Sequence, residues 1–154
     1  MTKDTSFLIW KSKMDAMIHE HPLQIVTWEA TRRCNLHCKH CGSPSEEVRV
    51  DNELTTEEVL GAFNQIAEDF DMAKFRHINI TGGEPFVRKD LVYILQQLSQ
   101  KPFYRNIDIQ TNSLVLGRKP ELLREIKNYG VTGIGVSIDG FRETHEDFRR
   151  MQGI

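Results

Sequence analysis

Apolar residues along the chain recur in two alternating patterns. Short runs rich in β-branched and aromatic residues, with apolar positions at every second residue, predict strands at about residues 23–30, 77–81, 106–111 and 133–138. Between them, apolar residues recur at steps of three and four, which predicts helices at about 55–71, 89–100 and 120–129. The chain therefore alternates strand with helix along most of its length.

The ends of two predicted helices carry further signals. Thr55 and Glu58 have the spacing of a capping box, Pro120 opens the last helix, and Gly130 follows it. Strands that alternate with helices imply right-handed crossovers and a parallel sheet. We therefore predict an α/β fold.

The predicted strands have one apolar and one polar face. Ile78, Ile80, Ile107 and Ile109 share the face that helices can cover. The opposite face carries polar residues: Asn79, Thr81, Asp108, Gln110, Asn112, Ser137 and Asp139. Because parallel strands are usually apolar on both faces, this pattern favours a wet or ligand-filled lumen over a partly solvated sheet face. We predict a partial (βα)n barrel of the TIM-like type with about four parallel strands.

The first 22 residues differ from the rest of the chain. Residues 4–20 predict a short helix that Pro22 closes and that packs on the domain. We expect 1–22 to form a helical extension and 23–154 to form the core. The only apolar run near the start is too short for a signal peptide, so we expect a cytoplasmic protein.

Charge and hydropathy exclude several classes of partner. The chain has 154 residues, with 20 Lys and Arg against 22 Asp and Glu, which gives a net charge of -2. This balance provides no general attraction to nucleic acid or to anionic lipid. No apolar run approaches the roughly 18 residues that cross a membrane, so we expect no membrane-spanning segment.

The cysteines are the main candidates for chemistry. Cys34, Cys38 and Cys41 are the chain's three cysteines, and their close spacing disfavours an ordinary disulfide framework. Three thiolates on one loop can bind three corners of an iron-sulfur cubane and leave the fourth iron open. The alternative is a zinc site with His37 or His40 as the fourth ligand.

A second motif, Thr-Gly-Gly-Glu-Pro, follows the predicted strand at 77–81. Gly82 and Gly83 allow a close approach of the backbone to a ligand, and Glu84 supplies an acceptor for an ammonium group. A tight turn before a helix is the alternative interpretation.

Together, the CxxxCxxC motif after the first strand, GGEP after the second and the repeated βα units resemble the radical S-adenosylmethionine (SAM) superfamily over roughly residues 23–150. The resemblance implies that Cys34, Cys38 and Cys41 hold a [4Fe-4S] cluster whose fourth iron is chelated by SAM. It also implies roles for further residues. Gly82, Gly83 and Glu84 would contact the methionine moiety, His40 the adenine and Ser137 the ribose. Gln110, Asn112 and Asp139 would line the same SAM and substrate cavity.

The resemblance further implies an enzyme that cleaves SAM reductively and starts hydrogen-atom abstraction, with a reductant such as ferredoxin or flavodoxin. Residues 133–145 are similar to the SPASM-type maturase branch, which implies a peptide or protein substrate. No general base is needed for hydrogen abstraction, so we expect His19, His21, His77 and His145 to be surface or structural residues.

The family's barrels contain more βα units than this chain, and the last unit predicted here has no completed helix. A half barrel exposes sheet edges, so we expect a fragment or one part of a longer or split enzyme that associates through the open edge. The competing hypothesis is a non-catalytic half-barrel scaffold or a zinc-binding protein.

Overall fold

The computed structural model describes residues 3–20, 22–42, 53–104 and 106–153, and within them the predicted α/β fold is confirmed. The described residues form one parallel sheet with the strand order β1-β2-β3-β4. The strands are β1 (Ile25–Thr31), β2 (His77–Gly82), β3 (Ile107–Thr111) and β4 (Val131–Val136). This arrangement is consistent with part of a TIM-like barrel.

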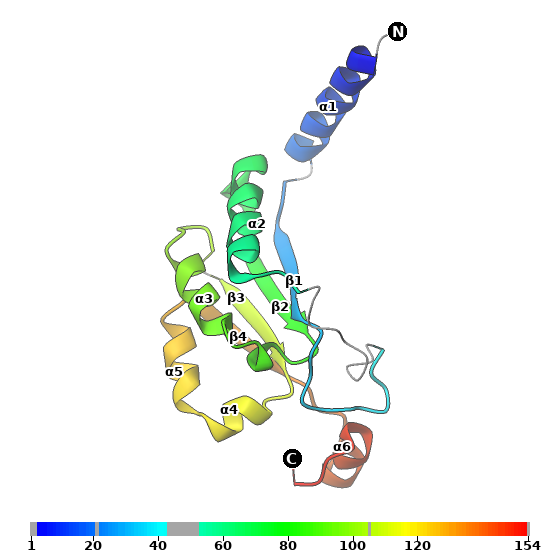
Figure 1. Ribbon diagram of the computed structural model, residues 1–154, viewed down its shortest axis with the longest axis vertical. Coiled ribbons are helices and arrows are strands. Elements are labelled where there is room, and N and C mark those ends of the chain that lie inside the picture. Colours follow the sequence, from blue (N-terminus) through cyan, green and yellow to red (C-terminus); the bar gives the residue numbers. More distant parts are fainter. Residues whose placement is uncertain (1–2, 21, 43–52, 105, 154) are drawn as a thin grey trace.

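Helices α2 (Thr56–Asp69), α3 (Leu91–Ser99) and α5 (Glu121–Lys127) connect successive strands and lie along one face of the sheet (Figure 1). The capping box at the start of α2 is present, because Thr55 accepts from the Glu58 N–H and Glu58 accepts from the Thr55 N–H. The remaining elements are shorter or terminal. They are α1 (Lys3–Glu20), η3 (Met72–Lys74), η4 (Pro85–Val87), α4 (Leu114–Arg118) and α6 (Arg142–Arg149).

The core lies between the apolar face of the sheet and these helices. Ile78 and Ile109 in the central strands are fully buried, and Ile94 and Leu95 of α3 are buried in the same cluster. The opposite face is polar, as predicted. A Cβ at Gly133 would lie 2.1 Å from Asp108 Oδ1, and one at Gly135 would lie 2.1 Å from Gln110 Oε1. The glycines of β4 thus leave room for the polar side chains of β3.

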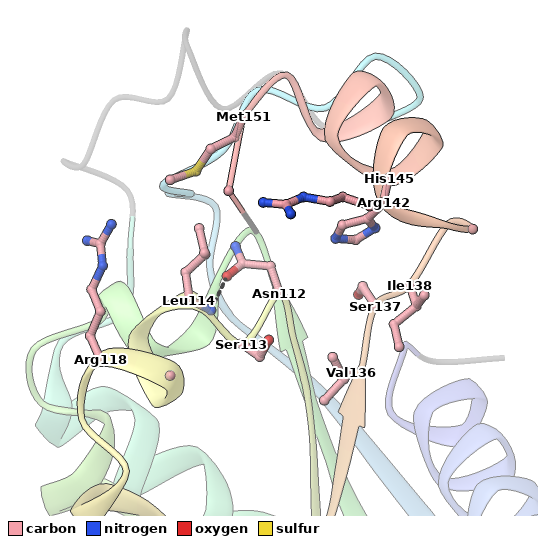
Figure 2. A pocket seen from close by; sticks show the side chains of 13 residues that line it. Asn112, Ser113, Leu114, Arg118, Val136, Ser137, Ile138, Arg142, His145 and Met151 are labelled. Carbon is pink, nitrogen blue, oxygen red and sulfur yellow. Dashed lines mark hydrogen bonds between the residues drawn. The ribbon is translucent and has the colours of Figure 1, made fainter.

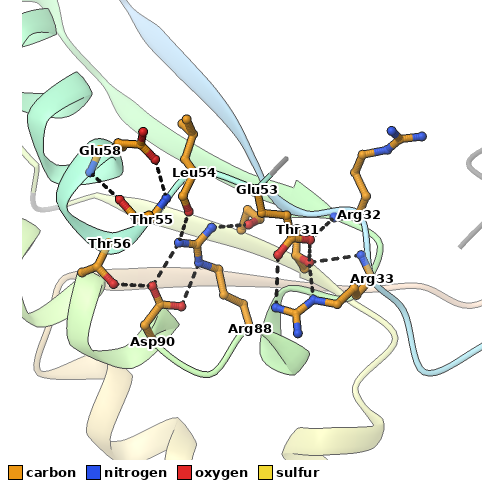
Figure 3. Close-up of polar contacts among 11 residues, drawn as sticks. Thr31, Arg32, Arg33, Glu53, Leu54, Thr55, Thr56, Glu58, Arg88 and Asp90 are labelled. Carbon is orange, nitrogen blue, oxygen red and sulfur yellow. Dashed lines mark hydrogen bonds and ion pairs between the residues drawn. The ribbon is translucent and has the colours of Figure 1, made fainter. Parts of the chain in front are cut away.

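The buried side chain of Arg88 connects the carboxyl end of β1 to the start of α2 (Figure 3). Arg88 binds both carboxylate oxygens of Asp90, at 2.9 and 3.0 Å, and donates to the carbonyls of Ala30 and Leu54, each at 2.8 Å. Thr56 at the first turn of α2 donates to the same Asp90 carboxylate. Because the guanidinium is almost fully buried, these four acceptors replace the water that it loses.

Two local predictions differ from the structure. Helix α1 forms, but it projects from the sheet and helices instead of packing on them (Figure 1), and Phe7 and Trp10 are more than half exposed. Residues 7–10 are consecutive apolar residues, so their side chains are distributed around the whole circumference of the helix. The helix therefore has no single apolar face to pack on the domain. At the other end, α6 forms where no completed helix was predicted. None of the described helices is long and apolar enough to cross a membrane.

Candidate functional site

The cysteine loop follows β1 directly and lies at the carboxyl edge of the sheet. Cys34 and Cys38 are partly buried and Cys41 is exposed. All three line one small cavity of about 130 Å³. Residues at the ends of β2, β3 and β4 share this cavity with them: Thr81, Gly82, Gly83, Gln110, Thr111, Asn112 and Ser137. Ligands bind at this edge in parallel α/β folds, so the cavity is the candidate site.

The glycine pair holds the base of the cysteine loop. Gly83 N–H donates to the Thr31 carbonyl at 2.8 Å, and Glu84 N–H donates to the Arg33 carbonyl at 2.9 Å. A Cβ at Gly82 would lie 2.2 Å from the Thr31 oxygen, and one at Gly83 would lie 2.2 Å from the Arg33 oxygen. Glycine is therefore needed at both positions because the GGEP backbone packs directly against the backbone of residues 31–33. Both glycines also line the cavity.

Glu84 lies beneath the site, fully buried and not among the residues that line the cavity. Its Oε1 accepts from Thr111 Oγ1 at 2.8 Å and from the Phe86 N–H at 3.2 Å, and its Oε2 accepts from the Asn112 N–H at 2.8 Å. The carboxylate thus joins the GGEP turn to the end of β3. Its contact with the methionine moiety of SAM stays a prediction.

Asn112 connects the end of β3 to the cysteine loop. Its side-chain amide donates to Asn35 Oδ1 at 2.7 Å and lies 3.9 Å from Cys34 Sγ. Burial raises the pKa of the Cys34 thiol, so a bound metal would have to displace a proton there. Ser137 follows β4, where its N–H donates to the Thr111 carbonyl at 3.0 Å, and it also lines the cavity.

His40 is not among the residues that line this cavity. Its ring lies 5.4 Å from that of Phe148 on α6, and its Nε2 lies 3.5 Å from Asp139 Oδ1. The predicted contact of His40 with the adenine therefore stays a prediction. In the structure, the His40 ring lies between the cysteine loop and α6.

Helix α6 packs against the cysteine loop, and this contact was not predicted from the sequence. The Lys39 N–H donates to the Phe148 carbonyl at 2.8 Å, and the Lys39 ammonium pairs with Asp147. At the end of the helix, Arg149 lines the cavity beside Cys38. The run of charged residues in α6 was the available signal, but it is equally typical of a solvated helix.

The described histidines outside the loop contact aspartates, and their expected surface or structural role stays a prediction. His145 on α6 is mostly buried, and its Nδ1 accepts from the Asp139 N–H at 3.2 Å. His77 lies 3.9 Å from Asp108 at the start of β2. His21 and the side chain of His19 lie outside the described residues.

A second cavity, of about 550 Å³, adjoins the first and shares Asn112 and Ser137 with it (Figure 2). Helix α6 contributes Arg142 and His145, and α4 contributes Leu114 and Arg118. The space is large enough for a small organic molecule and carries two cationic side chains.

The donor set fits a cluster better than a single metal ion. Within the described residues, no three His, Cys, Asp or Glu side chains are close enough together to hold one ion. The three cysteines nevertheless line one cavity. A four-iron cluster spreads its thiolate ligands more widely than tetrahedral zinc does, with Zn–S bonds of about 2.3 Å, so three thiols around a cavity fit a [4Fe-4S] cluster.

The family model described as the radical SAM superfamily matches residues 28–154. Curated relatives include the Fe-coproporphyrin III synthase of Methanosarcina barkeri, 37% identical over 131 residues, covering 84% of this chain and 30% of that protein. The pre-heme d1 synthase of Dinoroseobacter shibae is 35% identical over 133 residues, covering 86% and 31%. The molybdenum cofactor biosynthesis protein 1 of Drosophila melanogaster is 39% identical over 127 residues, covering 80% and 21%. The chain thus spans less than a third of the length of these relatives.

Proposed function

Because the chain belongs to the radical SAM superfamily, whose members use a [4Fe-4S] cluster and SAM, we propose that it carries the radical-generating site of such an enzyme. Cys34, Cys38 and Cys41 would hold the cluster in their thiolate form. The observation that carries the proposal is one cavity that brings these cysteines together with the GGEP glycines and the polar ends of β3 and β4. When bound, the cluster supplies the single electron that cleaves SAM.

The other residues of the cavity would bind and orient SAM. Gly82 and Gly83 present backbone without side chains on its wall, and Asn112 and Ser137 present polar groups after the neighbouring strands β3 and β4. Leu36, buried in the cysteine loop, also lines the cavity, and an apolar wall of this kind helps to exclude water from the reacting groups. The predicted contact of His40 with the adenine belongs to the same proposal.

The substrate is a separate proposal. The resemblance of residues 133–145 to the SPASM-type branch supports a peptide or protein. A second candidate, an anionic cofactor precursor, is supported by Arg118 and Arg142 beside the larger cavity. The relatives also support it, since their names refer to the synthesis of Fe-coproporphyrin III and pre-heme d1 and to molybdenum cofactor biosynthesis. A ferredoxin or flavodoxin would serve as reductant, and the open edge of β4 would pair with further barrel strands.

Anaerobic reconstitution of the full chain with iron and sulfide tests the proposal. We expect a [4Fe-4S] absorbance band, an electron paramagnetic resonance signal in the dithionite-reduced protein that changes when SAM is added, and release of 5'-deoxyadenosine. The chain purified with zinc serves as the control for adventitious thiol binding. Stoichiometric zinc without any SAM-sensitive cluster signal would support the zinc-binding alternative and overturn the proposal for this chain.

A further inference from the structure

An arginine and an aspartate form an ion pair beside one of the three cysteines. Arg149 Nε lies 2.5 Å from Asp139 Oδ2 and Nη2 lies 3.1 Å from Oδ1, so the guanidinium binds the carboxylate with two parallel bonds. The remaining nitrogen, Nη1, lies 3.7 Å from Cys38 Sγ. The side chains of Arg149 and Asp139 are 11% and 19% exposed, so both are partly shielded from water.

Neighbouring contacts fix the position of this pair. His145 and His40 lie 3.4 and 3.5 Å from the Asp139 carboxylate, and the Asp139 N–H donates to His145 Nδ1. The helix that carries Arg149 is itself attached to the cysteine loop through Lys39 and Phe148. The guanidinium is therefore held against Cys38 from two sides.

We propose that Arg149 donates a hydrogen bond to the thiolate of Cys38 and that the Asp139–Arg149 pair sets the reduction potential of the cluster. The inference rests on the proposed function, since it requires a cluster at Cys34, Cys38 and Cys41. Arg149 acts here as a positioning residue, because the inference concerns its contact with Cys38, a ligand of the cluster.

The sign of the effect follows from charge. Reduction adds one electron and no proton to the cluster, so the reduced form carries one more negative charge. A nearby guanidinium and a hydrogen bond to a ligating sulfur stabilise that form and raise the potential. Asp139 opposes this effect because its carboxylate compensates the charge of Arg149. The two residues of the pair therefore act on the potential in opposite directions.

The test is a redox titration with dithionite and mediators, followed by electron paramagnetic resonance, on the reconstituted full chain. We expect Arg149→Gln to lower the midpoint potential, because it removes the cation and leaves Asp139 negative. Asp139→Asn should raise the potential, because it leaves the cation uncompensated. Arg149→Lys should fall between Arg149→Gln and the wild type. A variant that merely loosened the fold would not give shifts of opposite sign.

Arg124→Gln is the matched control, since it makes the same change of charge at an exposed position on α5 and should leave the potential unchanged. Iron content and the cluster signal are measured first for every protein. A wild type that assembles no cluster overturns the proposed function and this inference with it. If the cluster assembles, equal potentials in wild type and Asp139→Asn, or shifts of the same sign in Asp139→Asn and Arg149→Gln, overturn this inference alone. If Arg149→Gln loses its cluster, the midpoint potential of Asp139→Asn alone tests the inference: a higher potential than in the wild type supports it, and an unchanged or lower one overturns it.

Discussion

The Glu84 carboxylate accepts a hydrogen bond from the backbone N–H of Asn112 at 2.8 Å, so the GGEP turn after β2 is joined to the end of β3. Asn112 in turn binds Asn35 in the cysteine loop. One buried carboxylate therefore connects, through a single residue, the turn that carries the glycine pair with the loop that carries the cysteines. Its position beneath the cavity indicates that Glu84 organises the site.

Replacing this carboxylate by an amide should destabilise the fold. In Glu84→Gln, one of the two acceptor oxygens becomes an NH2 group that faces N–H or O–H donors from Thr111, Phe86 or Asn112. A buried donor left without an acceptor costs about 1 to 3 kcal/mol. We expect the free energy of unfolding, measured by urea titration of the apo chain, to fall by about that amount.

The control for this variant is Glu125→Gln, which makes the same substitution at an exposed position of α5 and should change the stability by less than about 0.5 kcal/mol. Equal stabilities of Glu84→Gln and the wild type, together with lost SAM binding, would contradict an organising role and would assign the carboxylate to the ligand instead.

Gly83 gives a second test of how the loop is held. In Gly83→Ala the new Cβ would lie 2.2 Å from the Arg33 carbonyl oxygen, so the base of the cysteine loop has to move. We expect the free energy of unfolding to fall by about 1 to 3 kcal/mol and the iron content after reconstitution to be reduced.

Gly61→Ala is the matched control, because nothing lies within 4 Å of its Cβ. A glycine-to-alanine change inside α2 should stabilise the fold by roughly 0.5 to 1 kcal/mol. Equal iron binding in both variants would show that the close contact at Gly83 does not position the cysteines.

The fold could be predicted because its signals are local. Ile78 and Ile109 belong to short runs of period two, and Thr55 with Glu58 marks the start of α2 within a single turn. The polar face of the sheet was equally visible, since every second residue of the strands belongs to it. Local periodicity determines which elements form and which faces they bury.

The remaining features depend on contacts between residues far apart in the sequence. Arg88 reaches Ala30, 58 residues away, and Arg149 reaches Cys38, 111 residues away. Neither contact leaves a periodic signal in the sequence. Helix α6 is largely charged and only weakly apolar, so its place over the cysteine loop follows from specific partners such as Lys39. The role of Glu84 beneath the site could not be predicted either, because its partners Thr111 and Asn112 lie 27 and 28 residues away in the sequence.

Tyr104 provides a test of the core that depends on pH. Its hydroxyl donates to the Phe63 carbonyl at 2.6 Å, and burial raises its pKa to about 12. The unfolded chain, with a tyrosine pKa of about 10, loses this proton first, so the stabilising contribution is full below pH 10 and is lost as the pH rises toward 12. The loss should approach about 2 to 3 kcal/mol. In Tyr104→Phe the decline of the unfolding free energy over this range should be shallower than in wild type, and parallel curves would contradict the assignment.

The cysteine assignment can be tested against zinc binding with two variants of the same loop. Cys38→Ala removes one of the three thiolates around the cavity, so we expect it to abolish the [4Fe-4S] signal after anaerobic reconstitution. His40→Ala should retain the iron, because the ring of His40 lies against Phe148 and does not line the cavity. A Cys3His zinc site completed by His40 predicts the reverse for the histidine: His40→Ala would then lose metal as Cys38→Ala does. Iron and zinc contents of wild type and both variants, measured on the same preparations, therefore distinguish a [4Fe-4S] cluster from a zinc site completed by His40. Full iron retention in Cys38→Ala would refute the ligand assignment itself.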